Sequence, residues 1–270
     1  MLSQSNPATG LLKGDRVAEP TYAPHWTQVL SPGEIISGER ELDWLELAQQ
    51  GQATAAVWTG RQELVAPLLC RRFPDFAAAC ALSAESGWPV RLRRSGGGVV
   101  PQGSGILNVS LAYPCTRAPG DLADATYASI CNILSEALAG LGIEAFAHNV
   151  EGSFCDGRFN LAVAGDGAPR KIAGTAQYWR RAGNHYAVLV HALLVVDADP
   201  LALTAAANRF EAALGSGRQY DANALTNVSQ AWSAAHHDQT VPVALLTELP
   251  QRIIAALMMF NPEGEYYGIT

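Results

Sequence analysis

Residues 159–196 read FNLAVAGDGAPRKIAGTAQYWRRAGNHYAVLVHALLVV, and this stretch decides the fold. It contains three strand-like runs, residues 159–164, 171–180 and 185–196, separated by turns that contain Gly, Asp, Asn or Pro. Consecutive strand-like runs joined by such turns are typical of antiparallel strands that follow one another as a meander. We therefore expect the middle of a sheet to come from this part of the chain.

Helical patterns lie on both sides of the meander. Apolar residues recur at helical spacing in residues 39–50, 75–86, 121–141, 200–214, 228–234 and 242–260. Further strands are expected at residues 54–59, 90–94 and 106–113. Strands gathered in the middle with helices before and after predict an α+β fold, in which a mixed, largely antiparallel central sheet is flanked by helices.

The first 30 residues differ from the rest of the chain. They are polar, contain Pro7, Pro20 and Pro24, and are predicted to form an extended N-terminal arm. Residues 31–270 contain no internal repeat, charge block or low-complexity linker. Because one core can serve a chain of up to roughly 250 residues, we expect a single domain over residues 31–270.

The composition is that of a soluble globular protein, with 49% apolar and 16% charged residues among 270. A net charge of −7 speaks against nucleic acid as a partner, because nucleic-acid binding needs a basic face. The longest apolar run, residues 186–196, is shorter than the roughly 18 residues of a membrane span, and no signal peptide is recognised. Five cysteines without CxxC spacing favour free thiols and no metal site. We therefore expect a cytoplasmic protein without a membrane partner.

A glycine triplet follows the strand expected at residues 90–94. The sequence there is Arg93-Arg94-Ser95-Gly96-Gly97-Gly98. Consecutive glycines let the backbone approach a ligand closely, and their N–H groups can bind an anion. The alternative is a hairpin turn with solvated arginines. Neither a Rossmann nor a Walker A spacing is present.

Cys155 and Lys171 are the other two candidates for chemistry. Cys155 lies in a small, polar, Gly-flanked segment, the kind of setting in which a thiol can act as a nucleophile. Lys171, one of only two lysines, begins a strand that continues into the small residues of 174–176, which can admit a ligand chain. The alternatives are packing for Cys155 and a solvated strand end for Lys171. His148 is a possible general base, and His191 is expected to be a hydrogen-bonded core histidine.

Taken together, these stretches resemble the superfamily of biotin/lipoate protein ligases and octanoyltransferases, from about Ser37 to about Ser233. The family pattern is Arg-Arg-x-Ser/Thr-Gly-Gly-Gly, then Leu-Asn, then Asp-Gly-x-Lys-Ile/Val-x-Gly-x-Ala. It appears here as residues 93–98, as Leu107-Asn108 and as residues 170–177. The resemblance implies that residues 31–270 are a biotin/lipoate protein ligase-like catalytic domain.

Within this superfamily, residues 153–161 resemble the cysteine segment of the octanoyl-H-protein:protein octanoyltransferases. Asp156 and Asn160 replace the Pro and Asp of that pattern, and Gln102 stands where ligases often have His. His191 is reminiscent of the octanoyl-carrier-protein:H-protein transferases. The acyl donor therefore stays open between a carrier-protein thioester and an H-protein amide.

The resemblance implies an acyltransferase that moves an octanoyl or lipoyl group to a lysine of a lipoyl-carrier protein. Cys155 would form a thioester, and Lys171 would bind the acyl carbonyl and favour the thiolate. Backbone N–H groups near Gly174 and Thr175 would stabilise the oxyanion. The expected acyl- and substrate-binding residues are Arg93, Arg94, Ser95, Gly96, Gly97, Gly98, Asn108, Gly174, Thr175 and Ala176.

Two alternatives accompany this hypothesis. An ATP-dependent lipoate-protein ligase would form an acyl-AMP with ATP and Mg²⁺, whereas the transferase needs no cofactor. A non-catalytic member of the fold would bind the acyl group without turnover.

The implied partners are H-protein, the acyltransferase subunits of 2-oxoacid dehydrogenases and, as an alternative donor, acyl carrier protein. Because such partners are usually acidic, we expect a local basic patch, drawn from Arg91, Arg93, Arg94, Arg158, Arg170, Arg180 and Arg181.

Overall fold

The computed structural model describes residues 26, 28–30, 35–155, 157–237, 239–261 and 265–266. Residues 1–25 and 27 of the predicted N-terminal arm lie outside the described residues. Trp26 is buried, and its indole N–H donates to the carbonyl of Leu257. Trp26, which falls within the predicted arm, therefore packs in the core.

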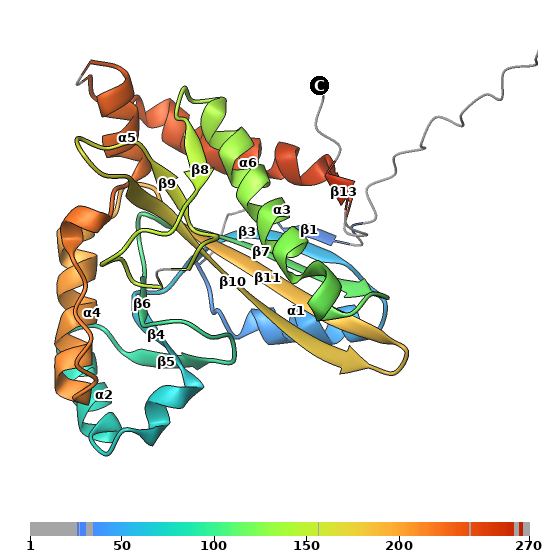
Figure 1. Ribbon diagram of the computed structural model, residues 1–270, viewed down its shortest axis with the longest axis horizontal. Coiled ribbons are helices and arrows are strands. Elements are labelled where there is room, and N and C mark those ends of the chain that lie inside the picture. Colours follow the sequence, from blue (N-terminus) through green and yellow to red (C-terminus); the bar gives the residue numbers. More distant parts are fainter. Residues whose placement is uncertain are drawn as a thin grey trace, which may run out of the picture.

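The centre of the molecule is an eight-stranded sheet of order β1-β3-β7-β11-β10-β9-β8, with β2 paired beside β3 (Figure 1). Its strands are β1 (Gln28–Leu30), β2 (Ile35–Ile36), β3 (Thr54–Gly60), β7 (Ile106–Cys115), β8 (Ala145–Ala147), β9 (Leu161–Val163), β10 (Arg170–Ala182) and β11 (His185–Val195). The predicted meander is confirmed, because β9, β10 and β11 are consecutive antiparallel neighbours. β1 and β2 run parallel to β3, so the sheet is mixed and the α+β prediction is confirmed.

Alternation along the strands divides this sheet into two faces. In β11, Val188, Val190 and Leu194 belong to the core that α3 (Pro119–Ala139), α5 (Val228–Ala235) and α6 (Val243–Met258) complete. Ala187 and Leu189 pack instead beneath α1 (Arg40–Gln49) on the opposite face. His191 has the same parity as Ala187 and Leu189, so its side chain points to the α1 face.

A second, three-stranded sheet lies beside the α1 face, with β4 (Glu63–Pro67) between β5 (Val90–Arg93) and β6 (Val100–Gln102). The 3-10 helix η1 (Leu68–Arg72), α2 (Phe76–Glu85) and α4 (Pro200–Leu214) pack on it (Figure 1). Because β5 and β6 both pair with β4, the glycine triplet is a connection between the two outer strands. The hairpin interpretation of this triplet is therefore wrong.

The remaining short elements are η2 (Ala222–Ala224), β12 (Phe260–Asn261) and β13 (Glu265–Tyr266). The boundaries of α4 follow its sequence closely, because Asp199 accepts the N–H of Leu201 at the N-terminus and Gly215 takes the left-handed conformation at the C-terminus. In the part of the chain that the structure describes, no helix is both long and apolar enough to span a bilayer.

Candidate active site

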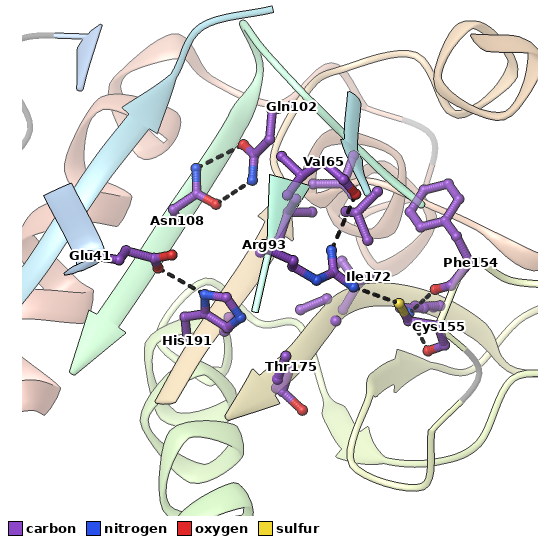
Figure 2. A pocket seen from close by; sticks show the side chains of 18 of the residues that line it. Glu41, Val65, Arg93, Gln102, Asn108, Phe154, Cys155, Ile172, Thr175 and His191 are labelled. Atoms are coloured by element: carbon purple, nitrogen blue, oxygen red, sulfur yellow. Dashed lines mark hydrogen bonds and ion pairs between the residues drawn. The ribbon is translucent and has the colours of Figure 1, made fainter. Parts of the chain in front are cut away.

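A cavity lies on the α1 face of the large sheet, where β7, β10 and β11 meet the small sheet (Figure 2). It encloses about 700 Å³, including its mouth, and most of its wall is apolar. The apolar wall consists of Val65, Val100, Phe154, Ile172, Leu193, Val195 and Leu225. A concave apolar site with a few polar groups is the usual form of a small-molecule or acyl-chain site.

Cys155 lies at one end of this cavity, in the loop between β8 and β9 (Figure 2). Its Sγ accepts the backbone N–H of Gly98 at 2.9 Å, and Nη2 of Arg93 lies 3.4 Å from the same sulfur. The φ of Cys155 is +57°, a conformation that is uncommon for residues with a side chain and that clusters at functional sites. The loop therefore holds this thiol in one defined position.

The glycine triplet makes room for the thiol. A Cβ at Gly97 would lie 2.5 Å from Sγ of Cys155, and its φ of +104° also favours glycine. A Cβ at Gly98 would lie 2.7 Å from the hydroxyl oxygen of Tyr220, whereas a Cβ at Gly96 would meet nothing. Two of the three glycines are thus required by close approach to their neighbours.

Lys171 binds the backbone of the same loop. Its ammonium donates to the carbonyl oxygens of Phe154 at 2.5 Å and Cys155 at 2.9 Å, and the residue is only 3% exposed. Gly174 leaves space for it, because a Cβ there would lie 3.1 Å from Nζ. Asn160 donates to the Cys155 carbonyl as well, at 2.6 Å. The alternative that Lys171 is a solvated strand end is therefore wrong.

A second, more open cavity lies on the outer side of Cys155. Cys155, Thr175 and Ala176 line both cavities. Tyr220 lines only the outer one, where its hydroxyl donates to the buried carboxylate of Glu211 at 2.7 Å. The thiol thus stands where an apolar interior meets an opening to the outside.

The end of the inner cavity away from Cys155 is polar. Figure 2 shows two pairs there, on the far side of Arg93 from the thiol. Gln102 and Asn108 exchange two amide hydrogen bonds, at 2.7 and 2.9 Å. Nδ1 of His191 lies 2.8 Å from Oε1 of Glu41. His191 is hydrogen-bonded as predicted, but the prediction that it is a core residue is wrong, because it is half-buried and lines the cavity.

The carboxylate of Glu41 is stabilised in its ionised form. Burial opposes ionisation, but the His191 imidazole, the Ser110 hydroxyl and the Arg91 guanidinium together lower the pKa of Glu41 below its usual value. The Ser110 hydroxyl donates to Oε1 at 2.7 Å and in turn accepts the indole N–H of Trp58 at 3.0 Å. The far end is therefore a connected hydrogen-bond network from α1, β3, β7 and β11.

The structure brings most of the predicted site residues to these two cavities. Those that line the inner cavity are Cys155, Lys171, Arg93, Asn108, Gly174, Thr175 and Ala176. The glycine triplet, residues 96–98, lines the outer cavity. Arg94 and Ser95 line an adjoining cleft beneath α1, which shares Glu41, Arg93 and His191 with the inner cavity.

His148 lies elsewhere. It is exposed and lines a different pocket with Glu151 and Asp166, so the structure does not support it as a general base for Cys155. Burial raises the pKa of the Cys131 thiol to about 12 and that of Cys70 above its usual value, which agrees with packing roles for both. Within the described ranges, no three His, Cys, Asp or Glu side chains gather where they could hold a metal ion.

Sequence reasoning missed Glu41 and Trp58 as cavity residues. Gln102 was recognised only as a departure from the ligase pattern, without a partner. No local signal identifies Glu41, since its helix resembles any amphipathic helix and its partner His191 is 150 residues away.

Several known proteins are similar to this chain in sequence. An uncharacterized protein of Cupriavidus necator is 46% identical over 217 residues, which cover 77% of this chain and 86% of that protein. An octanoyl-[GcvH]:protein N-octanoyltransferase of Kyrpidia tusciae is 39% identical over 120 residues, which cover 42% of this chain and only 40% of the relative.

Among solved structures, a lipoate-protein ligase A bound with ATP has a TM-score of 0.51 at 17% identity, with 84% of this chain and 94% of that one covered. At that identity the likeness shows the fold alone. It confirms a ligase-like arrangement of the sheets.

A family model, the lipoyl protein ligase A/B catalytic domain, matches residues 76–248. The match includes the glycine triplet, Cys155 and Lys171, and it spans more than half of the chain. The relatives with named activities include octanoyl-[GcvH]:protein N-octanoyltransferases, which supports an enzyme of this family. This chain therefore belongs to the lipoyl protein ligase A/B catalytic domain family.

Proposed function

We propose that this protein transfers an octanoyl or lipoyl group to a lysine of a lipoyl-carrier protein through a thioester on Cys155. The observation that carries the proposal is the position of Sγ between the inner and outer cavities, 2.9 Å from the Gly98 nitrogen. An acyl chain in the inner cavity would bring its carbonyl to the sulfur, while the outer cavity would admit donor and acceptor in turn.

In the first step, the Cys155 thiolate attacks the acyl carbonyl carbon of the donor. A C–S bond forms, the donor's C–S or C–N bond breaks, and the leaving group takes up a proton. In the second step, the uncharged amine of the acceptor lysine attacks the thioester, the bond to Cys155 breaks, and the amine loses a proton. No electron is gained or lost, and the division into two easier steps is what a covalent nucleophile contributes.

Two donors next to the sulfur would assist the first step. The Gly98 N–H and the Arg93 guanidinium both point at Sγ, and a sulfur anion accepts from both. Preorganised donors of this kind act strongly where water is excluded. We assign both groups to holding the thiolate.

Lys171 fits a positioning role in this scheme. It holds the carbonyls of Phe154 and Cys155, so it fixes the backbone on which the nucleophile is mounted. The family resemblance implies that Lys171 contacts the acyl carbonyl directly. For that contact, the ammonium would have to release the carbonyl of Phe154 or Cys155 and bind the acyl oxygen instead.

The test is intact-protein mass spectrometry with octanoyl-carrier protein or octanoyl-H-protein, with and without ATP. The wild type should gain one octanoyl group without ATP, Cys155→Ala should gain none, and Cys80→Ala should behave as the wild type. The productive donor then identifies the acyl source.

The alternatives give different results. ATP-dependent loading of free lipoate onto an acceptor domain by wild type and Cys155→Ala alike would contradict the proposal and identify a ligase that uses ATP and Mg²⁺. Retention of the acyl group with neither reaction would identify a non-catalytic member of the fold.

A further inference from the structure

The 3-10 helix η1 lies between the two entrances to the site. Leu69 lines the outer cavity together with the glycine triplet, residues 96–98. Leu68 and Arg71 line the cleft beneath α1, together with Arg94. One short segment therefore borders both openings on either side of the loop that contacts Cys155.

Two adjacent leucines of η1 are exposed. Leu68 and Leu69 are 42% and 59% exposed, although the following Cys70 is buried in the core. Isolated apolar residues on a surface need no explanation, but neighbouring ones at the rim of a site are typical of a contact surface. Covering them would be favourable, because apolar area is removed from water.

The cations around these leucines have no carboxylate partner. Arg61, Arg71, Arg94 and Arg218 line the cleft or the outer cavity and are exposed, and among the described residues none of them forms an ion pair. The chain as a whole has a net charge of −7, so four unpaired arginines around one site give this region a charge opposite in sign to that of the whole protein.

The carboxylates of the same region do not cancel this charge. Glu63 is paired with Arg91 at 2.7 Å, and Asp124 is paired with Arg158. Glu41 is paired with His191. Among the described residues that line the cleft, Glu39 is therefore the exposed acid without an ion pair. Among the described residues that line the cleft and the outer cavity, four arginines without an ion pair therefore stand against one unpaired acid.

We infer that Leu68, Leu69, Arg71, Arg94 and Arg218 form a docking surface for an acidic protein domain that presents the acceptor lysine to Cys155. The inference rests on the proposed function, which requires a lysine on a partner protein to reach the outer cavity. Unpaired arginines complement carboxylates on the partner, and the leucines supply the apolar contact that a protein surface offers and a nucleic-acid backbone does not.

This surface replaces the basic patch expected from the sequence. Of that predicted set, Arg91 and Arg158 are paired with acids, and Arg93 points at the thiol. Arg181 lies near the β10–β11 turn, where its guanidinium donates to the carbonyl of Gly183. Arg180 donates to Oε1 of Gln49, and Arg170 lines the pocket that contains His148, so Arg94 alone of the predicted set belongs to the docking surface.

The test compares Arg71→Glu and Leu69→Asp with Arg181→Glu, a charge reversal away from both cavities. The probe is an isolated lipoyl domain from a 2-oxoacid dehydrogenase. Three quantities are measured: acylation of Cys155 by the uncharged thioester octanoyl-N-acetylcysteamine, kcat/KM for transfer to the domain, and binding of the unmodified domain at low and high salt.

For Arg71→Glu we expect kcat/KM for transfer and affinity for the domain to fall by about tenfold, and the salt dependence to weaken. Acylation by the small thioester should stay within about twofold of wild type, since that donor needs no docking. Leu69→Asp should weaken domain binding at both salt concentrations, and Arg181→Glu should change none of the three quantities.

Equal transfer and binding by Arg71→Glu, Leu69→Asp and Arg181→Glu would overturn the docking surface. Tighter binding of a single-stranded oligonucleotide than of the lipoyl domain would overturn it as well. If the wild type binds the domain through Arg71 but Cys155 is never acylated, the proposed function fails and the docking surface stands.

Discussion

The two ends of the inner cavity are built in different ways. At the Cys155 end, most contacts have a backbone group on one side: the Gly98 N–H on the thiol, and the Phe154 and Cys155 carbonyls on Lys171. At the far end, side chains do so, as in the Gln102–Asn108 amide pair and the Glu41–His191 pair. A backbone-built end tolerates few substitutions because the chain itself must pass close by, whereas a side-chain network can be exchanged by repacking. We therefore expect the Cys155 end to determine the chemistry and the far end to determine which acyl chain fits the cavity.

Among variants that keep the Cys155 thiol, Gly97→Ala should have the largest effect on acylation. The added Cβ would lie 2.5 Å from Sγ of Cys155, and alanine is strained at a φ of +104°, so the thiol or the loop must move. Because a displacement of about 1 Å can cost roughly a hundredfold in rate, Cys155 acylation should fall by about that factor. The rate of adduct formation measured by mass spectrometry tests this.

Gly96→Ala is the matched control. A Cβ at Gly96 meets nothing within 4 Å, so this variant should keep most of the acylation rate. Equal losses in the two variants would show that the triplet acts through general flexibility and not through close approach to the thiol.

Lys171→Met should affect both stability and rate. The methionine nearly preserves the length of the side chain but removes the ammonium donor from the Phe154 carbonyl, whereas the Cys155 carbonyl keeps the Asn160 amide. An unsatisfied buried acceptor costs about 1–3 kcal/mol, so the free energy of unfolding should fall by at least that amount. Denaturant titration measures it.

Acylation of Lys171→Met, measured under conditions where the variant is fully folded, should also be slower than in the wild type. A variant that is less stable but acylates at the wild-type rate would show that Lys171 supports the fold and does not position the nucleophile.

Glu41→Gln should change the pH dependence of stability and have the smallest effect on acylation. The folded-state pKa of Glu41 is depressed, so its ionised form stabilises the fold above the usual carboxyl pKa of 4.5, and this contribution is lost as pH falls through the folded value. The wild type should therefore lose more stability than Glu41→Gln between neutral pH and acid below 4.5.

Thermal unfolding at a series of pH values compares the two proteins. Parallel curves would mean that the Glu41 carboxylate does not contribute through ionisation. A large loss of Cys155 acylation in Glu41→Gln at neutral pH would contradict the separation of the two ends.

The same contrast explains what could be predicted from the sequence. The Cys155 end is recognisable because close approach restricts residue types locally: Gly97 and Gly98 beside Cys155, and Gly174 beside Lys171. Similarly, the meander is recognisable because β9, β10 and β11 are consecutive and joined by turns with turn-forming residues.

Of the far end, Asn108 was among the predicted site residues, but the pairing of Glu41 with His191 could not be predicted because the two meet only in three dimensions. Glu41 is on α1 and His191 on β11, and nothing in either local pattern indicates the other. The short strands β4 and β6 were not predicted, for a related reason. β6 pairs with β4, and β4 pairs also with β5, so pairing stabilises these strands and a strong pattern of their own does not.

The central claim is that Cys155 carries the acyl group. The most direct measurement is peptide mapping of the wild-type protein after incubation with octanoyl-H-protein or octanoyl-carrier protein in the absence of ATP. We predict one octanoyl group on Cys155 that hydroxylamine releases as expected for a thioester, and that passes to a lipoyl domain when the domain is added. An acyl group on another residue, or undiminished transfer by Cys155→Ala, would contradict the account.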